Sequence, residues 1–367
     1  MPSQPRKLHH KQQGIALIVA LIVTMLAVTI AATVLYRQQI HIRLSGNIAH
    51  LEQAYLYAQG MEEFAGTILK DSYKDHPNYD SYKDIWAFEG IVFPILGGTM
   101  SGQMYDLQGR INLNSLARPI PPKLTDADKK NPDGTLKNPA PVQKPDIAGI
   151  TRYRLQNLIQ EIDPNDSMGP PQDFARIVKD WIDKDQINGN TKPDDAGTGS
   201  GAESPFYQSM QPAYFSANTL LVNPTELRLL KNMNKEIYNK LINPDPKKSL
   251  VATLPIVDAQ NKPIATPINV NTASKDVLQS IGFDPATAED IIRERDINPF
   301  KTMENSFLQA AINAQGNNID ANDLDVKSSY FLLRGAVEIN NARLTINSIL
   351  YRKNGKVSVI MRDFSNP

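Results

Sequence analysis

The stretch Gly14-Ile15-Ala16-Leu17-Ile18-Val19-Ala20-Leu21 opens an apolar run that continues to Leu35. From Ile15 onward the run contains no charged residue, no glycine and no proline, and Arg37 closes it. The run is long enough to cross a bilayer, because about 20 helical residues span the hydrocarbon core. We therefore expect one membrane-spanning helix at the start of the chain.

A basic leader precedes the run and contains Arg6, Lys7 and Lys11. Basic residues beside a membrane helix favour the cytoplasmic side, so the rest of the chain is expected beyond the membrane. A cleaved secretory signal does not fit, because its apolar region is only about 7–15 residues long. Two interpretations remain: a plain signal anchor, and a helix whose leader is cleaved on the cytoplasmic side after Gly14.

The second interpretation rests on a family resemblance. The basic leader, Gly14 and the apolar helix that begins at Ile15 resemble a type IV prepilin. In that family a prepilin peptidase cuts after the glycine and methylates the new N-terminus, which would be Ile15. Pilins usually carry glutamate at the fifth mature position, where this chain has Val19.

The composition argues against an enzyme. The chain has 367 residues, a formal net charge of +0, no cysteine and 5 histidines, none of them beyond His76. Most of the chain therefore lacks the commonest general base and metal ligand. A neutral chain also has no overall field that would attract nucleic acid or an anionic surface. We expect no catalytic residue.

Apolar residues at helical spacing continue beyond the membrane run and predict one helix to about Tyr73. Glu62 and Glu63 lie off the apolar stripe. The stripe consists of Ile40, Leu44, Ile48, Leu51, Tyr55, Ala58, Met61, Ala65 and Ile68. A helix of this length predicts a pilin-like layout, with a globular head packed on its distal part; the alternative is an anchor followed by an ordinary amphipathic helix.

Strand patterns occur at both ends of the remaining chain. Residues 85–93 and 102–107 predict two strands, and residues 330–339, 342–352 and 357–362 predict three more, joined by short polar turns. Together they predict an antiparallel sheet that packs on the long helix. The predicted fold class is α+β, with a large α-helical insertion between the two groups of strands.

The insertion contains helical patterns over 146–183 and 225–241, after a proline-rich segment over 119–145 that predicts a flexible loop.

Residues 267–300 resemble a helix-hairpin-helix, a module that often binds DNA phosphates. Residues 267–310 carry four basic and seven acidic side chains, a net charge of −3. Because phosphate binding is electrostatic, we expect a structural or protein-binding role and no nucleic acid.

An acidic loop in the insertion is the strongest candidate for a metal site. Closely spaced oxygen ligands suit Ca²⁺, although the spacing is not that of an EF-hand. A solvated acidic loop is the alternative. The predicted ligands are Asp183, Asp185, Asp194, Asp195 and Glu203.

Three of these regions resemble the protein K family of type II secretion, the large minor pseudopilins. The resemblance is carried by Asp106-Leu107-Gln108-Gly109-Arg110, by Asp180-Trp181-Ile182-Asp183, and by the helix-hairpin-helix pattern. Protein K lacks the usual glutamate at the fifth mature position, so Val19 agrees with it. The resemblance implies that calcium binds in the acidic loop.

The resemblance also implies a function and a location. It predicts a single-pass protein of the bacterial inner membrane, with a cytoplasmic leader and a periplasmic head, at the tip of the pseudopilus. There it would initiate pseudopilus assembly and support export of folded proteins across the outer membrane. Expected partners are the other minor pseudopilins, the major pseudopilin, the inner-membrane secretion platform, the prepilin peptidase and membrane lipid.

The predicted organisation has seven parts. They are the leader (1–14), the transmembrane helix (15–36), its periplasmic continuation (37–74), the first part of the head (75–115), the inserted helical domain with the acidic loop (116–265), the helix-hairpin-helix domain (266–325) and the strands that complete the head (326–367). Two alternative functions remain open: a minor pilin or adhesin of a type IV pilus, and a membrane-anchored DNA-binding protein.

Overall fold

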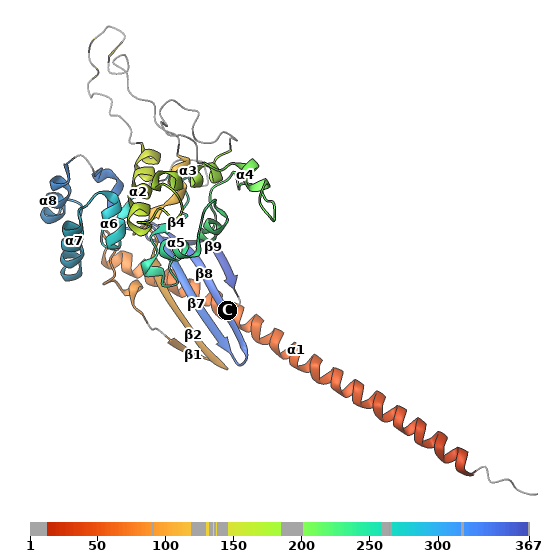
Figure 1. Cartoon of the computed structure of the whole chain (residues 1–367). Coiled ribbons are helices and arrows are strands. Elements are labelled where there is room, and N and C mark those ends of the chain that lie inside the picture. Colours follow the sequence, from red (N-terminus) through yellow and green to blue (C-terminus); the bar gives the residue numbers. More distant parts are fainter. Residues whose placement is uncertain are drawn as a thin grey trace, which may run out of the picture.

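The computed structural model describes residues 13–89, 92–118, 130–131, 135, 137, 146–184, 201–257, 264, 266–316 and 319–365. Helix α1 (Gln13–Asp75) is 63 residues long and projects far out of the globular part (Figure 1). Among the described residues it is the one helix long and apolar enough to cross a membrane. The predicted long helix is confirmed, and it ends two residues beyond the predicted Tyr73.

A five-stranded antiparallel sheet packs against the distal part of α1. Its strands follow the order β1-β2-β7-β8-β9. They are β1 (Val92–Ile95), β2 (Gly98–Asp106), β7 (Tyr330–Ile339), β8 (Ala342–Lys353) and β9 (Lys356–Ser365). Strands β2 and β7 are neighbours in the sheet, although the whole insertion separates them in the sequence. Met104, for example, lies opposite Leu333. The predicted α+β class is confirmed, including the insertion between β2 and β7.

The first predicted strand is wrong at its start. Residues Ile85–Ala87 form a short 3₁₀ helix (η1), and the strand begins only at Val92. Asp84 accepts hydrogen bonds from the backbone N–H of Ser81 and from Nε1 of the buried Trp86. These local bonds turn the chain where an alternating pattern predicted an extended one. Strand β2 also begins earlier than predicted, at Gly98.

The buried face of α1 is shorter than the predicted stripe. Ala58, Met61 and Ala65 are buried against the sheet as predicted, whereas the stripe residues from Ile40 to Tyr55 are exposed. The reason is that the sheet covers only the distal part of the helix. Small side chains let α1 approach closely, and the sulfur of Met61 occupies the space beside two strand glycines, Gly102 and Gly335.

Glu62 was predicted to lie off the buried face of the helix, and this prediction is wrong. It is only 4% exposed and binds the sheet. Its carboxylate accepts hydrogen bonds from the hydroxyl of Ser348 and from Nε of Arg362, the latter at 2.8 Å. A buried charge is tolerated when it is paired and hydrogen-bonded. Glu62 therefore fixes α1 against β8 and β9.

The insertion forms a separate helical unit with its own apolar core, at the end of the sheet opposite the projecting part of α1 (Figure 1). Its helices are α2 (Ile147–Ile162), α3 (Pro171–Ile182), α4 (Ser204–Gln208), α5 (Lys235–Leu241), α6 (Lys275–Ile281), α7 (Pro285–Ile297) and α8 (Ser306–Ala314). Short parallel pairs join β3 (Ile111–Asn112) to β4 (Val251–Ala252) and β5 (Ile268–Asn269) to β6 (Leu324–Asp325).

The single helix predicted over 225–241 is also wrong. The chain forms a 3₁₀ helix, η3 (Pro224–Leu229), and then α5, with Asn232 between them at φ 61°. Asn223 and Asn234 cap the two helices with their side chains. Asparagine favours caps and left-handed conformations, so the apolar spacing is interrupted by local bonding.

The close approach of α1 to the sheet generates a stability prediction. A Cβ at Gly335 overlaps the Met61 sulfur and lies 3.0 Å from Cγ2 of Ile346. Overpacking of this kind costs about 1–3 kcal/mol. We expect Gly335→Val to lower the free energy of unfolding of the detergent-solubilised chain by that amount. Ala336→Val, on the opposite face of β7, should change it by less than about 0.5 kcal/mol. Equal losses in both variants would contradict the packing.

Candidate functional site

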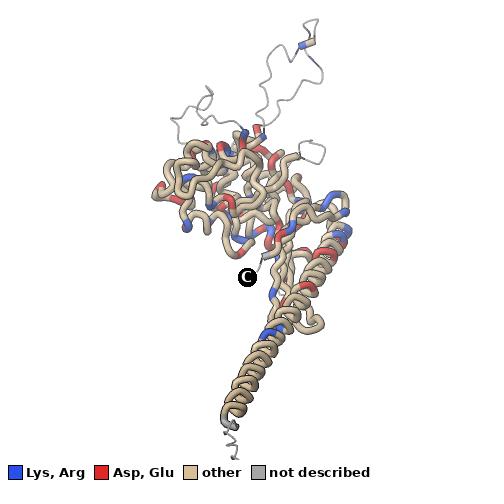
Figure 2. The backbone as a smooth tube through the Cα atoms, turned by 90° about the vertical axis from the view of Figure 1, so that its right-hand side faces the viewer, with Lys and Arg blue, Asp and Glu red and all other residues tan. Residues whose placement is uncertain are grey.

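The predicted cleavage site lies at the start of α1. The helix includes Gly14 and Ile15, and the side chains of Ile15 and Val19 are exposed. Residues 1–12 of the leader lie outside the described residues. Figure 2 shows that the first part of α1 carries no charged residue, in contrast to the mixed charges of the helical unit. The exposed apolar surface fits a surrounding of lipid or of other apolar helices.

Two of the five predicted calcium ligands lie at the ends of the acidic loop. Asp183 ends α3, and Glu203 precedes α4 and is 3% exposed. Asp185, Asp194 and Asp195 lie outside the described residues. Within the described part of the chain, no group of three or more His, Cys, Asp or Glu side chains is arranged to hold a metal ion.

A further carboxylate at this place was not among the predicted ligands. Asp180, on the last turn of α3, is 1% exposed, and a Cβ on Gly201 would overlap its carboxylate. The chain therefore passes very close to Asp180 where it returns from the loop. Burial raises the pKa of the nearby Tyr207, and the charges of Asp180 and Glu203 add to the rise. Two buried acids thus lie near one tyrosine.

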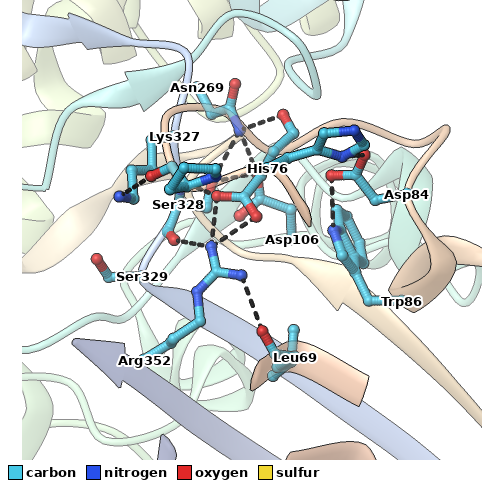
Figure 3. Close-up of polar contacts among 12 residues, drawn as sticks. Leu69, His76, Asp84, Trp86, Asp106, Asn269, Lys327, Ser328, Ser329 and Arg352 are labelled. Atoms are coloured by element: carbon cyan, nitrogen blue, oxygen red, sulfur yellow. Dashed lines mark hydrogen bonds and ion pairs between the residues drawn. The ribbon is translucent and has the colours of Figure 1, made fainter. Parts of the chain in front are cut away.

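A second polar cluster joins the two cores (Figure 3). Arg352 of β8 donates from Nη2 to both carboxylate oxygens of Asp80, at 2.6 and 2.5 Å, and to the carbonyl of Ser328 at 2.9 Å. Its Nη1 donates to the carbonyl of Leu69 in α1 at 3.3 Å. Both charged side chains are buried. The arginine therefore ties α1 to the segment that follows it and to the entry of β7.

Asp106 is the centre of this cluster on the side of the helical unit. It lies at the end of β2 and is fully buried. Its Oδ2 accepts hydrogen bonds from Nδ2 of Asn269 at 3.2 Å, from Oγ1 of Thr272 at 2.5 Å and from Oγ of Ser328 at 2.7 Å. Burial raises the pKa of Asp106, while the bonds from Ser328 and Thr272 oppose the rise. One strand end thus holds the helical unit and β7 together.

The residues that follow Asp106 complete the junction. Gln108 donates from Nε2 to the carbonyl of Pro267 and accepts from the backbone N–H of Ser329. A Cβ on Gly109 would lie 2.7 Å from Oγ1 and 2.9 Å from the carbonyl oxygen of Thr272. The family-like sequence 106–109 is therefore explained by contacts between the head and the helical unit.

The predicted helix pair over residues 267–300 is present as α6 and α7, joined through Gly282 at φ 126°. Asp284 accepts hydrogen bonds from the N–H groups of Ala286 and Thr287 and caps α7. Bonds from Thr287 lower the pKa of Asp284 to about 2. Asp284-Pro285 is a helix-start signal that identifies this cap from sequence.

The basic residues of this helix pair are already engaged. Lys275 pairs with Glu289, and Arg293 pairs with Asp290 at 2.5 Å. Arg295 is buried and donates to the carbonyl of Val270. A phosphate at this helix pair would therefore meet paired basic side chains and the Asp284 carboxylate. The absence of a nucleic-acid partner stays a prediction.

Models of known protein families match two segments of the insertion. Two models described as type II secretion system (T2SS), protein K match residues 109–243 and 268–327. The chain is 27% identical over 358 residues to type II secretion system protein K of Aeromonas hydrophila, covering 96% of both chains. It is 29% identical over 360 residues to the protein K of Pseudomonas aeruginosa, covering 96% of this chain and 92% of that one.

A solved structure shares the fold. The chain matches a chain of the GspK-GspI-GspJ complex from enterotoxigenic Escherichia coli with a TM-score of 0.64 and 21% identity, over 86% of this chain and 97% of that chain. The similarity confirms the pilin-like fold. Together with the family models and the relatives, it confirms the predicted resemblance to protein K.

The buried Asp80 generates a pH prediction. Burial raises the pKa of Asp80 to about 6, and Arg352 opposes the rise. A carboxyl of the unfolded chain titrates near pKa ~3.9. The folded state thus binds this proton more tightly, so the stability contributed by the site is complete below about pH 4 and is lost as the pH rises through about 6.

We expect Asp80→Asn to remove this dependence. The free energy of unfolding of the wild type, minus that of the variant, should fall by about 3 kcal/mol between pH 4 and pH 7. Denaturant titrations of the detergent-solubilised chain at several pH values measure it. Glu338→Gln, in the exposed pair with Arg343, is the control and should give a nearly constant difference. A difference that rises with pH would refute the direction of the Asp80 shift.

Proposed function

The chain belongs to the type II secretion system protein K family and is a minor pseudopilin, and we propose that it caps the tip of the pseudopilus. In this position it initiates assembly of the filament and supports export of folded proteins across the outer membrane. The family is one of structural pseudopilins and not an enzyme family.

One observation carries the proposed tip position. The helical unit lies at the end of the sheet away from the projecting part of α1, in both views (Figures 1 and 2). In a filament of parallel pilin-like subunits, this end faces the next subunit above. A bulky unit there obstructs further stacking, whereas a single copy at the tip meets no such neighbour.

Val19 supports the same position. Glutamate at this place in other pilins pairs with the N-terminal amine of a neighbouring subunit, and valine cannot make this buried pair. We infer that the prepilin peptidase cleaves after Gly14 and methylates Ile15. The leader then lies in the cytoplasm, the helix spans the inner membrane in contact with lipid, and the head lies in the periplasm.

Partners of this head are the other minor pseudopilins, with the major pseudopilin and the inner-membrane secretion platform below them. An exposed apolar surface beside α1 suits such contacts. Its exposed side chains are Phe64, Ile85 and Phe88, which line one apolar pocket together with Phe93. Contiguous apolar surface on a folded protein commonly marks a site of protein contact.

Co-expression tests the assignment. We expect the full chain, extracted in detergent, to co-purify with the two other minor pseudopilins of the same system in one complex. N-terminal sequencing of the chain from that complex should begin at Ile15. In a strain that lacks the gene, the wild type should restore export, and Gly14→Val should not. Gly46→Ala, at an exposed glycine of the same helix, is the matched control for export. A chain that stays monomeric with both partners present would refute the assignment.

We also propose that the acidic loop binds Ca²⁺. Oxygen ligands from Asp183 and Glu203 at the two ends of the loop, together with the predicted Asp185, Asp194 and Asp195, suit this ion. The position of the buried Asp180 and Glu203 at the two ends of the loop supports it, because carboxylate oxygens are the ligands that Ca²⁺ prefers. The ion would hold the ends of the loop together.

Calorimetry of the full chain tests calcium binding. After treatment with a chelator, addition of Ca²⁺ should release heat and raise the melting temperature, since a ligand that binds the folded state stabilises it. Glu203→Gln should weaken the affinity at least about tenfold. Asp290→Asn, in an exposed pair on α7, should leave it unchanged. Neither heat nor a shift in melting temperature in the wild type would rule out the site.

A further inference from the structure

Arg110, the last residue of the sequence 106–110, makes different contacts from Asp106, Gln108 and Gly109. Asp106, Gln108 and Gly109 all contact the segment from Pro267 to Thr272, or the entry of β7. Arg110 instead lines a cleft between the sheet and the helical unit. This cleft has a volume of about 310 Å³, which is within the range of ligand sites.

The floor of the cleft is the face of the sheet that α1 does not cover. The register places Leu332, Ile349 and Met361 side by side on β7, β8 and β9. A second row lies two residues further along each strand and consists of Arg334, Asn347 and Asp363. Leu107 and Leu254 add to the apolar wall. The cleft therefore has an apolar floor bordered by a polar row.

Arg110 brings a buried positive charge to this cleft. It is 9% exposed, and its Nη2 donates to the carbonyl of Pro246 at 2.7 Å. It forms no ion pair with any carboxylate of the described residues. Burial lowers the pKa of Arg110, and the charges of the nearby Asp106 and Asp245 oppose this fall. Neither carboxylate forms an ion pair with the buried guanidinium, so an anion that binds beside it gives it a direct partner.

Arg334 adds a second cation at the same end of the cleft. It is exposed, and its Nη1 donates to the carbonyl of Pro244 at 3.0 Å. The two guanidinium groups thus bind carbonyls of the same short loop, 244–246. Asp363 is the only acid among the residues that line the cleft. It lies two strands from Arg334, or roughly 10 Å at the usual strand spacing.

We propose that this cleft binds the C-terminal end of an extended polypeptide whose last side chain is apolar. The terminal carboxylate binds Arg110 and Arg334, with the geometry that guanidinium groups offer to carboxylates. The apolar side chain lies on Leu332, Ile349 and Met361. The backbone of the peptide hydrogen-bonds along the polar row.

The polar lining favours a peptide over a fatty acid, which has the same carboxylate and an apolar chain. Asn347 and Thr253 offer hydrogen bonds at the cleft, and Asp363 accepts them. An alkyl chain satisfies none of these groups, whereas a peptide backbone has donors and acceptors at every residue. This binding site is independent of the proposed tip position, since it rests only on the cleft.

Fluorescence anisotropy with the detergent-solubilised full chain tests the proposal. The probes are two fluorescein-labelled octapeptides of one uncharged sequence that ends in leucine, one with a free carboxylate and one with a C-terminal amide. We expect saturable binding of the free acid and at least about tenfold weaker binding of the amide, because hydrogen bonds between charged groups are lost. An excess of palmitate should not displace the acid peptide.

Three variants and one matched control locate the binding. Arg334→Gln, at an exposed position, and Ile349→Trp, which fills the cleft, should each weaken binding of the acid peptide at least about tenfold. Arg343→Gln, an exposed arginine in the pair with Glu338, is the matched control and should bind normally. Arg110→Gln should abolish the preference for acid over amide, and its melting temperature shows whether the variant is folded.

Several results would overturn the proposal. They are absence of binding up to about 1 mM peptide, equal affinity for acid and amide, and normal binding by both Arg334→Gln and Ile349→Trp. Loss of binding in Arg343→Gln would point to general charge attraction. Displacement of the acid peptide by palmitate would assign the cleft to fatty acids. None of these results bears on co-purification with the minor pseudopilins, which tests the family function separately.

Discussion

The buried pair of Asp80 and Arg352 is the interaction on which the two-part architecture depends. Neither group is accessible to water, so each needs the other and the surrounding hydrogen bonds to offset the loss of hydration. Ser328 connects this pair to Asp106, and Asp106 connects it to Asn269 and Thr272 of the helical unit. The two apolar cores are joined through directional bonds, which define one relative orientation in a way that apolar contact alone does not.

Helix α1 meets two environments with one continuous backbone. Its first part is apolar on every side, as lipid or a bundle of like helices requires. Its distal part has one narrow buried face of small residues, of which Ala58 and Ala65 are examples, and these allow the sheet to approach closely. Glu62 adds a polar contact within that interface. The helix is continuous over Gln13–Asp75, so no break separates its apolar part from the part that binds the sheet.

The sequence was sufficient for the long helix, the sheet and the insertion, because these depend on periodicity along the chain. Asp84 forms local hydrogen bonds at the start of a predicted strand, and the chain turns there. Asn223 and Asn234 cap two short helices where one helix was predicted. Both differences arise because short polar side chains compete with regular structure. At the acidic loop, the pattern of acids predicted Asp183 and Glu203 as ligands, and their binding of a metal stays a prediction. The burial of Asp180 was not predicted, because it depends on the packing of α3 against other segments.

The sequence by itself therefore determined the membrane helix, the α+β class, the family and the motif at 106–110. Only the tertiary structure decided what that motif does. Asp106, Gln108 and Gly109 meet partners more than 150 residues away, such as Asn269 at a separation of 163 positions. Arg110 faces a cleft whose floor comes from the last three strands. The physical reason is that periodicity reports which face of an element is buried, whereas the partner of a polar group depends on where the whole chain returns.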